Sequence, residues 1–300
     1  MVEGGKVAAK VAVAPDSWGV WFPEDSRQVP WSRFLDEASA AGFDAVELGP
    51  YGYLPTSVER LRAELSARGL TLTGAFFMSE FQAPGNWSAS KDEVSKICDL
   101  LNAFGAGHLV LLNSLYTDLG NGARVASTEL DSDTWSRQLE TLHAIAAYTA
   151  EHGIATVYHP HCDTVIQYEG QIETLLQNTD PSTVSLCLDV GHHAYAGGDA
   201  VSFMQRHHDR IPYIHLKNVD PEVISSVRKD DIAFAKAVGM GAFTTLDAGS
   251  VDMRAFRQVL DSVGYDGWAV VEQDMYPCPF DKPFPIARRN REFLQAISFG

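Results

Sequence analysis

The sequence predicts an α/β protein with a single (β/α)8 barrel (TIM barrel) domain over residues 1–300. Eight short apolar runs rich in β-branched residues recur along the chain, and amphipathic segments separate them. Such alternation predicts a parallel sheet. Because the chain has no GxGxxG or GxxxxGK(S/T) motif, a closed barrel is favoured over a doubly wound nucleotide-binding sheet. The length also fits a barrel of about 250 residues with insertions.

The expected strands are short and apolar, as in HLVLLN and WAVV. Parallel strands that are buried on both faces have this composition. The eight strands are expected at residues 10–18, 44–50, 71–77, 108–114, 155–161, 184–192, 211–219 and 267–274.

Helices are expected between these strands, where apolar residues recur at helical spacing. Several of the segments end at a glycine that could cap the helix, and a strand follows within a few residues. These segments are residues 31–41, 57–69, 91–104, 133–153 and 253–264, and their glycines are Gly42, Gly69, Gly105, Gly153 and Gly264.

The connection from Asn218 to about Asp266 is the main irregularity. It holds one ordinary helix and an extra segment, an excursion at about residues 219–250. An insertion after the seventh strand of a barrel would lie over the catalytic face. No Pro/Ser-rich linker divides the chain, so one domain remains the prediction.

Composition narrows the possible partners. The formal net charge of −16, with 23 basic against 39 acidic residues, argues against nucleic-acid binding, which needs clustered Lys and Arg. No apolar stretch approaches the ~18 residues of a membrane span, and the N-terminus does not read as a signal peptide. The four cysteines are scattered without a CxxC pair, which argues against disulfides or structural zinc. A cytoplasmic protein is expected.

Polar residues follow the predicted strands at their carboxyl ends, where this fold builds its active site. Taken singly, a histidine or acid there is more often a loop hydrogen-bonding group than a ligand. Four in succession favour a metal site, because imidazole and carboxylate ligands from neighbouring strands can converge. The predicted ligands are His159, Asp189, His215 and Glu272.

Four motifs resemble the sugar-phosphate isomerase/epimerase superfamily of xylose-isomerase-like barrels. They are YHPHCDT at 158–164, LDVGH at 188–192, YIHLKNV at 213–219 and GYDGWAVVEQD at 264–274. Within the superfamily the likeness is greatest to the myo-inosose dehydratases (2-keto-myo-inositol dehydratases). It rests on WGVWFPED near the start, the HxH of residues 159–161, the insertion and the Pro-rich tail, and it covers most of the chain.

The resemblance implies that Asp189, His215 and Glu272 occupy metal positions of the superfamily. His159 stands where many relatives have a glutamate. In the epimerases, two metal-bound glutamates act as acid and base on opposite faces of the substrate, and a histidine breaks that symmetry. The expected reaction is therefore a metal-dependent elimination of water from a cyclic polyol or keto sugar, which makes the protein a hydro-lyase.

Four side chains are the candidate catalytic groups for this hypothesis. Glu272 would remove the proton α to the ketone, and His161 or His192 would protonate the departing hydroxyl. Lys217 would hydrogen-bond the carbonyl or a ring hydroxyl. The divalent metal, Mn²⁺ or Co²⁺ by preference and Mg²⁺, Fe²⁺ or Zn²⁺ as alternatives, would stabilise the enediolate.

Three further residues are candidates for substrate binding. Trp18 could form an apolar wall against a ring face, Glu47 could bind a hydroxyl on the opposite side, and Asp274 ends the same strand as Glu272. The expected partner is a small polyhydroxylated ketone. A homo-oligomer is possible through the aromatic and Pro-rich tail.

Other readings stay open on the sequence alone. An isomerase or epimerase of a keto sugar or inosose could use the same site, and so could a lyase that eliminates the aglycone of a 3-keto-glycoside. A Schiff-base aldolase with Lys217 as nucleophile would need no metal. A binding protein without turnover is the remaining class.

Overall fold

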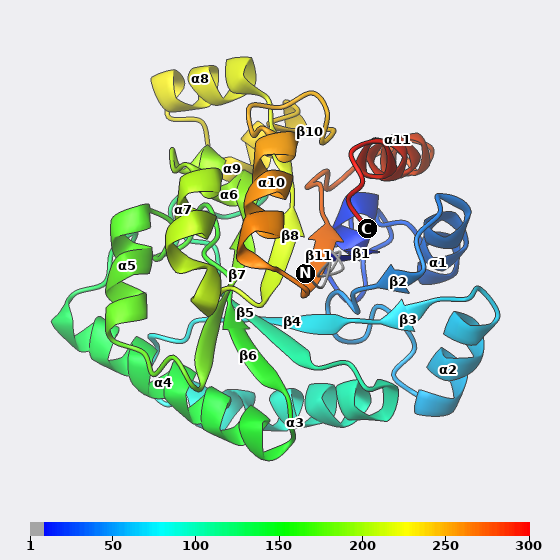
Figure 1. Ribbon diagram of the computed structural model, residues 1–300. Helices are drawn as coiled ribbons and strands as arrows, with labels where there is room; N and C mark the ends of the chain where they lie inside the picture. The colour runs from blue at the N-terminus through cyan, green and yellow to red at the C-terminus, as the bar shows by residue number, and fades with distance from the viewer. Residues whose placement is uncertain (1–8) are drawn as a thin grey trace, which may run out of the picture.

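The computed structural model describes residues 9–300. Nine strands form one parallel sheet in the order β3-β2-β1-β11-β8-β7-β6-β5-β4, which curls into a nearly closed barrel (Figure 1). The strands are β1 (Lys10–Val13), β2 (Ala45–Val46), β3 (Thr71–Leu72), β4 (Gly74–Ser79), β5 (His108–Asn113), β6 (Ala155–Tyr158), β7 (Val184–Asp189), β8 (Tyr213–Leu216) and β11 (Trp268–Val271).

The barrel closes because its first and last strands pair. Lys10 to Val13 of β1 lie in register with Trp268 to Val271 of β11. On the other side, β3 pairs with β2 and β4 pairs with β5, and only Thr73 separates β3 from β4. The predicted (β/α)8 barrel is confirmed, with the expected strand at 71–77 divided in two.

The observed strands end earlier than predicted. The expected strand at 10–18 stops at Val13, because Pro15 to Trp18 form a 3-10 turn. The expected strand at 184–192 stops at Asp189, whose carboxylate caps the helix that follows. The carboxyl ends therefore bend into loops sooner than apolar patterning indicates, and His192 lies on a helix.

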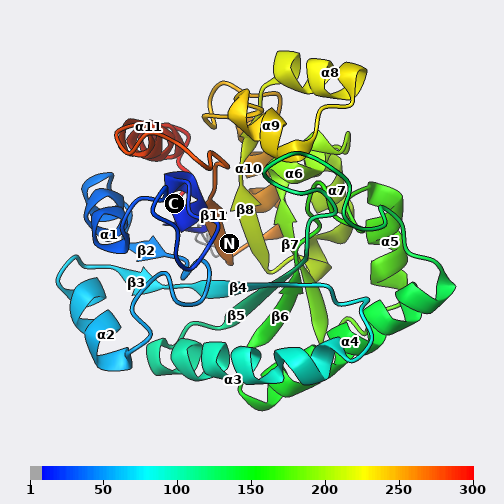
Figure 2. The same cartoon turned by 180° about the vertical axis from the view of Figure 1, so that it is seen from behind.

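Helices surround the barrel (Figures 1 and 2). They are α1 (Trp31–Ala40), α2 (Val58–Ser66), α3 (Asn86–Phe104), α4 (Ser132–Glu151), α5 (Glu169–Gln177), α6 (Val190–Tyr195), α7 (Ala200–His207), α8 (Pro221–Asp230), α9 (Phe234–Gly239), α10 (Met253–Val263) and α11 (Pro283–Ala296). All five predicted capping glycines have positive φ, between 66° and 92°, as a left-handed helix end requires.

The apolar core has two layers. One large cluster fills the space between the sheet and the surrounding helices. A smaller cluster inside the barrel uses slim side chains such as Ala12 and Val157 around Tyr213. The Tyr213 hydroxyl pairs with Thr73 Oγ1 at 2.8 Å and donates to Glu47 Oε1 at 2.9 Å. Above this layer the barrel interior becomes polar.

The excursion folds as a small unit beside the carboxyl ends of the strands. Residues Asn218–Val219 (β9) pair antiparallel with Phe243–Thr244 (β10), and α8 and α9 lie between them in sequence. Buried apolar residues of this unit form their own cluster with Cys162. α8 projects from the rest of the molecule (Figures 1 and 2).

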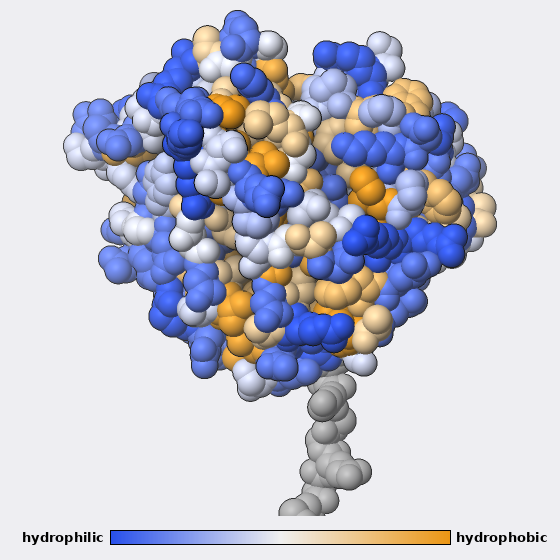
Figure 3. All heavy atoms as spheres, turned by 90° about the horizontal axis from the view of Figure 1, so that it is seen from above, coloured by the Kyte–Doolittle hydropathy of each residue, from blue (hydrophilic) through white to orange (hydrophobic). Residues whose placement is uncertain are grey.

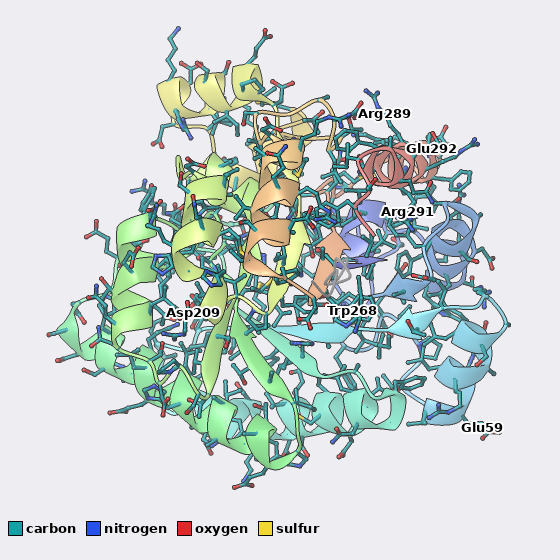
Figure 4. All side chains as sticks on the ribbon, in the orientation of Figure 1. Glu59, Asp209, Trp268, Arg289, Arg291 and Glu292 are labelled. Carbon is teal, nitrogen blue, oxygen red and sulfur yellow. The ribbon has the colours of Figure 1, made fainter. Side chains whose placement is uncertain are left out.

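The surface is mostly hydrophilic, with apolar residues scattered in small groups on the face seen in Figure 3. Arg289, Arg291 and Glu292 project from α11 on the outside of the molecule (Figure 4). All four cysteines are free. None of the helices among residues 9–300 has both the length and the apolar character needed to cross a membrane.

Candidate active site

Four buried side chains converge at the carboxyl ends of β6, β7, β8 and β11, which are neighbours in the sheet. His159 and Glu272 each follow a strand directly, Asp189 ends one, and His215 lies within β8. One ligand atom from each lies within 4.8 Å of the others, and no residue of the four is more than 6% exposed. We call this group the metal cluster. It contains the four ligands predicted from the sequence.

Hydrogen bonds orient the two imidazoles of the metal cluster. His159 Nδ1 lies 2.8 Å from the Pro160 carbonyl, which can only accept, so Nδ1 carries the proton and Nε2 keeps its lone pair. His215 Nε2 lies 3.2 Å from Glu47 Oε1, which leaves Nδ1 facing Glu272. Such contacts fix the tautomer of metal-binding histidines.

Buried polar atoms of the cluster fit a divalent cation. Asp189 Oδ1 accepts hydrogen bonds from the amides of Gly191 and His192, both at 2.8 Å, whereas Oδ2 is buried without a hydrogen-bond partner and has the Lys217 ammonium 3.2 Å away as an ion-pair partner. Burial raises the pKa of Asp189 to about 6, so a bound cation would stabilise its ionised form. Two imidazoles and two carboxylates suit Mn, Co, Fe or Zn. The donor set alone does not select among these metals.

A second group, His161, His192 and Asp274, lies beside the metal cluster, and its potential ligand atoms also approach within 4.8 Å. The Lys217 ammonium lies between the two groups. Its Nζ is 2.8 Å from His192 Nε2, 2.9 Å from Asp274 Oδ2 and 2.9 Å from Glu272 Oε2. The lysine therefore links the predicted base to the predicted acids.

Charges in this group are strongly perturbed. Burial opposes a charge on Lys217, but the carboxylates around it raise its pKa well above its usual value. Burial lowers the pKa of His161 to about 4 and that of His192 well below its usual value. Lys217 is therefore charged and both imidazoles are neutral at pH 7. A protonated lysine is a poor nucleophile, which argues against the Schiff-base aldolase.

The cavity above these groups has a polar floor and an apolar wall. A ring with hydroxyls at its edge and an apolar face would contact both surfaces. The floor includes side chains from both groups, and the wall contains aromatic and aliphatic residues from several loops. The lining residues are Asp16, Trp21, Phe22, Phe76, Met78, Leu112, Leu115, Leu119, His159, His161, His215, Lys217, Phe234, Glu272 and Asp274.

Residues 35–297 match the model of a family described as xylose isomerase-like TIM barrel. The chain belongs to this family. An inosose dehydratase of Geobacillus thermodenitrificans is 30% identical over 290 residues, which are 95% of this chain and 96% of that protein. The predicted resemblance to the xylose-isomerase-like barrels, and among them to inosose dehydratases, is confirmed. The prediction of an enzyme is confirmed as well.

Solved structures of proteins with different sequences show the same fold. The probable 3-DHS dehydratase AsbF from Bacillus anthracis has a TM-score of 0.70 at 15% identity, and the match covers 95% of this chain and 98% of that one. A structure of the IOLI protein with a bound zinc atom has a TM-score of 0.69 at 12% identity, with 96% and 98% covered. At these identities the likeness concerns the fold alone.

Two predicted substrate-binding residues do not line the cavity of this family member. Trp18 is fully buried, packs edge-on against Phe34 at 5.0 Å and donates from Nε1 to Glu37 Oε2 at 2.7 Å. Glu47 is fully buried beneath His215. Trp21, and not Trp18, lines the cavity, and Glu47 contacts the predicted ligand His215.

Sequence reasoning missed several lining residues. Asp16 lies in the 3-10 turn that begins two residues after β1, so a search for polar residues beyond strand ends could find it. Its Oδ2 is buried without a hydrogen-bond partner, and burial together with nearby carboxylates raises its pKa well above the usual value. Phe234 comes from the excursion and Phe22 from the loop after β1. No local pattern marks these two as lining the cavity.

Proposed function

We propose that this protein is a metal-dependent hydro-lyase that abstracts the proton α to the ketone of a cyclic polyhydroxylated substrate and eliminates water. The observation that carries the proposal is the asymmetry of the metal cluster. In the row of four strands, Glu272 lies at one end and the neutral imidazole of His159 lies at the other. A single carboxylate at the ends of this row suits one-sided proton removal better than a symmetric exchange between two faces.

A divalent ion held by His159, Asp189, His215 and Glu272 would polarise the carbonyl and stabilise negative charge as the α-proton leaves. Glu272 is suited to the role of base. Burial opposes its charge, but His215 and Lys217 lower its pKa well below the usual value, so it is ionised at neutral pH. The carboxylate can then accept the proton from carbon.

The proton for the leaving hydroxyl would come from the neighbouring group. The neutral imidazoles of His161 and His192 hold no excess proton, whereas Lys217 does and its Nζ donates to His192 Nε2 at 2.8 Å. We therefore propose that His161, which lines the cavity, or His192 beside it passes a proton to the β-hydroxyl, and that Lys217 supplies the proton that replaces it. Glu272 Oε2, 2.9 Å from Lys217 Nζ, then returns the abstracted proton to the lysine. The C–O bond breaks as the electrons of the broken C–H bond form the new double bond, and water leaves.

The substrate class is a small polyhydroxylated ketone such as an inosose. An apolar wall that includes Trp21 and Phe234 would pack on the ring face, and the polar floor would bind the ring oxygens. The relatives named as inosose dehydratases support this class. Mn²⁺ or Co²⁺ remains our preferred metal.

Proton NMR of the metal-supplemented protein with 2-keto-myo-inositol tests the proposal. We expect loss of water to give an unsaturated ketone, abolition of turnover by EDTA, and recovery on adding Mn²⁺ or Co²⁺. An isomeric product without loss of water would show an isomerase or epimerase instead. Turnover that persists after complete metal removal would contradict the metal-dependent mechanism.

A further inference from the structure

A second cavity of about 410 Å³ lies beside the catalytic cavity. Small-molecule sites in proteins occupy about 300–1,000 Å³. The connection between β5 and α4, the segment after β6 and the excursion together build it. Its lining residues are Tyr116, Thr117, Gly122, Arg124, Asp163, Gln167, Tyr168, Tyr195, Ala196, Val227, Arg228, Asp231, Ile232, Ala233 and Phe234.

The floor of this second cavity is a buried polar network. Thr117, Asp163 and Gln167 are 8%, 6% and 7% exposed. The Thr117 hydroxyl donates to Asp163 Oδ2, and Gln167 Nε2 donates to the Tyr116 hydroxyl at 3.1 Å. These bonds hold polar side chains in fixed directions under the cavity. Buried polar groups of this kind give a ligand site its specificity.

Several polar groups at the second cavity are available to a ligand. Within residues 9–300, the Arg124 guanidinium and the Tyr195 hydroxyl make no hydrogen bond or ion pair, and the Asp163 carboxylate accepts from Thr117 through Oδ2. Tyr168 lies at the rim and is 54% exposed, which is unusual for a large aromatic side chain of this protein. Such a ring offers a flat surface on which the face of a ligand can stack.

Charge balance selects the class of ligand. Arg124 and Arg228 are offset by Asp163 and Asp231 on the same cavity, so no net charge favours an anion or a cation. Arg228 already donates to the backbone carbonyls of Ala194 and Tyr195, at 3.2 and 2.9 Å. Paired hydrogen-bonding groups together with three tyrosine rings suit a neutral molecule with many hydroxyls and apolar C–H faces.

We propose that this cavity is a second binding site, specific for a neutral polyhydroxylated ring. Phe234 forms the partition, because it lines both cavities and its ring centroid lies 5.3 Å from that of His161. Leu115 and Leu119 face the catalytic cavity, whereas Tyr116 and Thr117, from the same loop, face the second one. The site needs no metal ion, so the proposal does not rest on the proposed reaction.

The test is calorimetric titration of the EDTA-treated full-length protein with myo-inositol, and with inorganic phosphate as a charged probe. We expect the wild type to bind myo-inositol. The double variant Arg124→Ala/Tyr195→Phe should bind at least tenfold more weakly, because it lacks two unpaired donors of the second cavity. Glu272→Gln alters the catalytic cavity, so any binding of myo-inositol there can change, whereas the affinity of the second cavity should stay that of the wild type. Circular dichroism would confirm that both variants fold.

Three outcomes of the myo-inositol titrations would overturn the proposal. They are absence of myo-inositol binding to the wild type, unchanged affinity in the double variant, and a loss of affinity in Glu272→Gln equal to that in the double variant. Binding of phosphate in preference to myo-inositol would also contradict it, because it would show an anion site. Each result leaves the product assay of the catalytic cavity unaffected.

Discussion

The floor and the wall of the catalytic cavity are built in different ways. The floor consists of side chains at or next to strand ends, and their positions follow from the parallel register of β6, β7, β8 and β11. The wall consists of Trp21, Phe22, Phe234 and other loop residues, whose positions depend on contacts between distant segments. Trp21, for example, stacks on Phe234 with centroids 6.1 Å apart.

This contrast separates two tasks of the site. In the proposed reaction the floor binds the metal ion and performs the chemistry, so its substitutions should change turnover, metal affinity or the stability of the metal-free protein. The wall would pack on the substrate, so its substitutions should change KM. If single substitutions changed both kcat and KM, the floor and the wall would not have separate tasks.

Glu272→Gln should have the largest effect on turnover. The amide keeps the size of the side chain but cannot accept the α-proton, so we expect kcat to fall by about 10²–10⁴-fold. Metal content, measured on the purified variant, should remain close to that of the wild type because three ligands are unchanged. Near-normal kcat with bound metal would exclude Glu272 as the base.

Lys217→Met should have the largest effect on stability. Lys217 Nζ lies 3.2 Å from Asp189 Oδ2 and 2.9 Å from both Glu272 Oε2 and Asp274 Oδ2, so its loss leaves three buried carboxylates without their shared cation. We expect the free energy of unfolding of the metal-free protein to fall by about 3–5 kcal/mol, measured by denaturant titration. Added Mn²⁺ should restore part of it. An equal loss with and without metal would contradict this account.

Glu47→Gln should weaken metal binding without removing a ligand. Glu47 Oε1 accepts from His215 Nε2, and loss of its charge should lower the metal affinity by about 10–100-fold, as measured by competition with a chelator. Tyr213→Phe is the matched control, because it removes the other donor to Glu47 and leaves the His215 contact in place. If both variants bind metal equally well, Glu47 does not position His215.

Most of the fold and the floor of the site could be predicted from the sequence. Strand periodicity and the glycine after each helix are local signals, and polar residues at strand ends are local signals too. These signals together predict His159, Asp189, His215 and Glu272 as one group. The parallel register of the strands then brings these four side chains together, because the carboxyl ends of parallel strands lie at one side of the barrel.

The wall could not be predicted, because side-chain direction there depends on loop geometry. Trp18 and Trp21 are three residues apart, yet Trp18 faces α1 and Trp21 faces the cavity. The 3-10 turn from Pro15 to Trp18 determines which of the two rings faces the cavity. The apolar pattern of the sequence does not predict the direction of this turn. Glu47 shows the same limit, since it was expected at the substrate and lies beneath His215 instead.

The variants Trp21→Ala and Trp18→Phe test whether Trp21, and not the predicted Trp18, forms the apolar wall. Trp21→Ala should raise KM by roughly tenfold with little change in kcat, because an apolar contact is equally strong in the bound substrate and the transition state. Trp18→Phe should lower the melting temperature, because the Nε1 donor to Glu37 is lost, and leave KM unchanged. If steady-state kinetics showed a raised KM for Trp18→Phe and an unchanged KM for Trp21→Ala, Trp18 and not Trp21 would form the wall.

Asp163→Asn should give the smallest effect, a pH-dependent gain in stability at the second cavity. Burial raises the pKa of Asp163 from 3.8 to about 6, so the native state binds the proton more tightly than the unfolded state does. The wild type therefore loses stability as the pH rises from about 4 to 6, whereas the asparagine variant does not ionise.

Asparagine also tolerates the positive φ of 64° and can accept the bond from Thr117. Above pH 6 we expect the free energy of unfolding of the variant to exceed that of the wild type by about 1 kcal/mol, because solvent screens the charge at a partly open site. Below pH 4 ionisation should make no difference between the two proteins. Thermal unfolding across this pH range measures both. A difference that does not vary with pH would show that the pKa of Asp163 is the same in the native and the unfolded states.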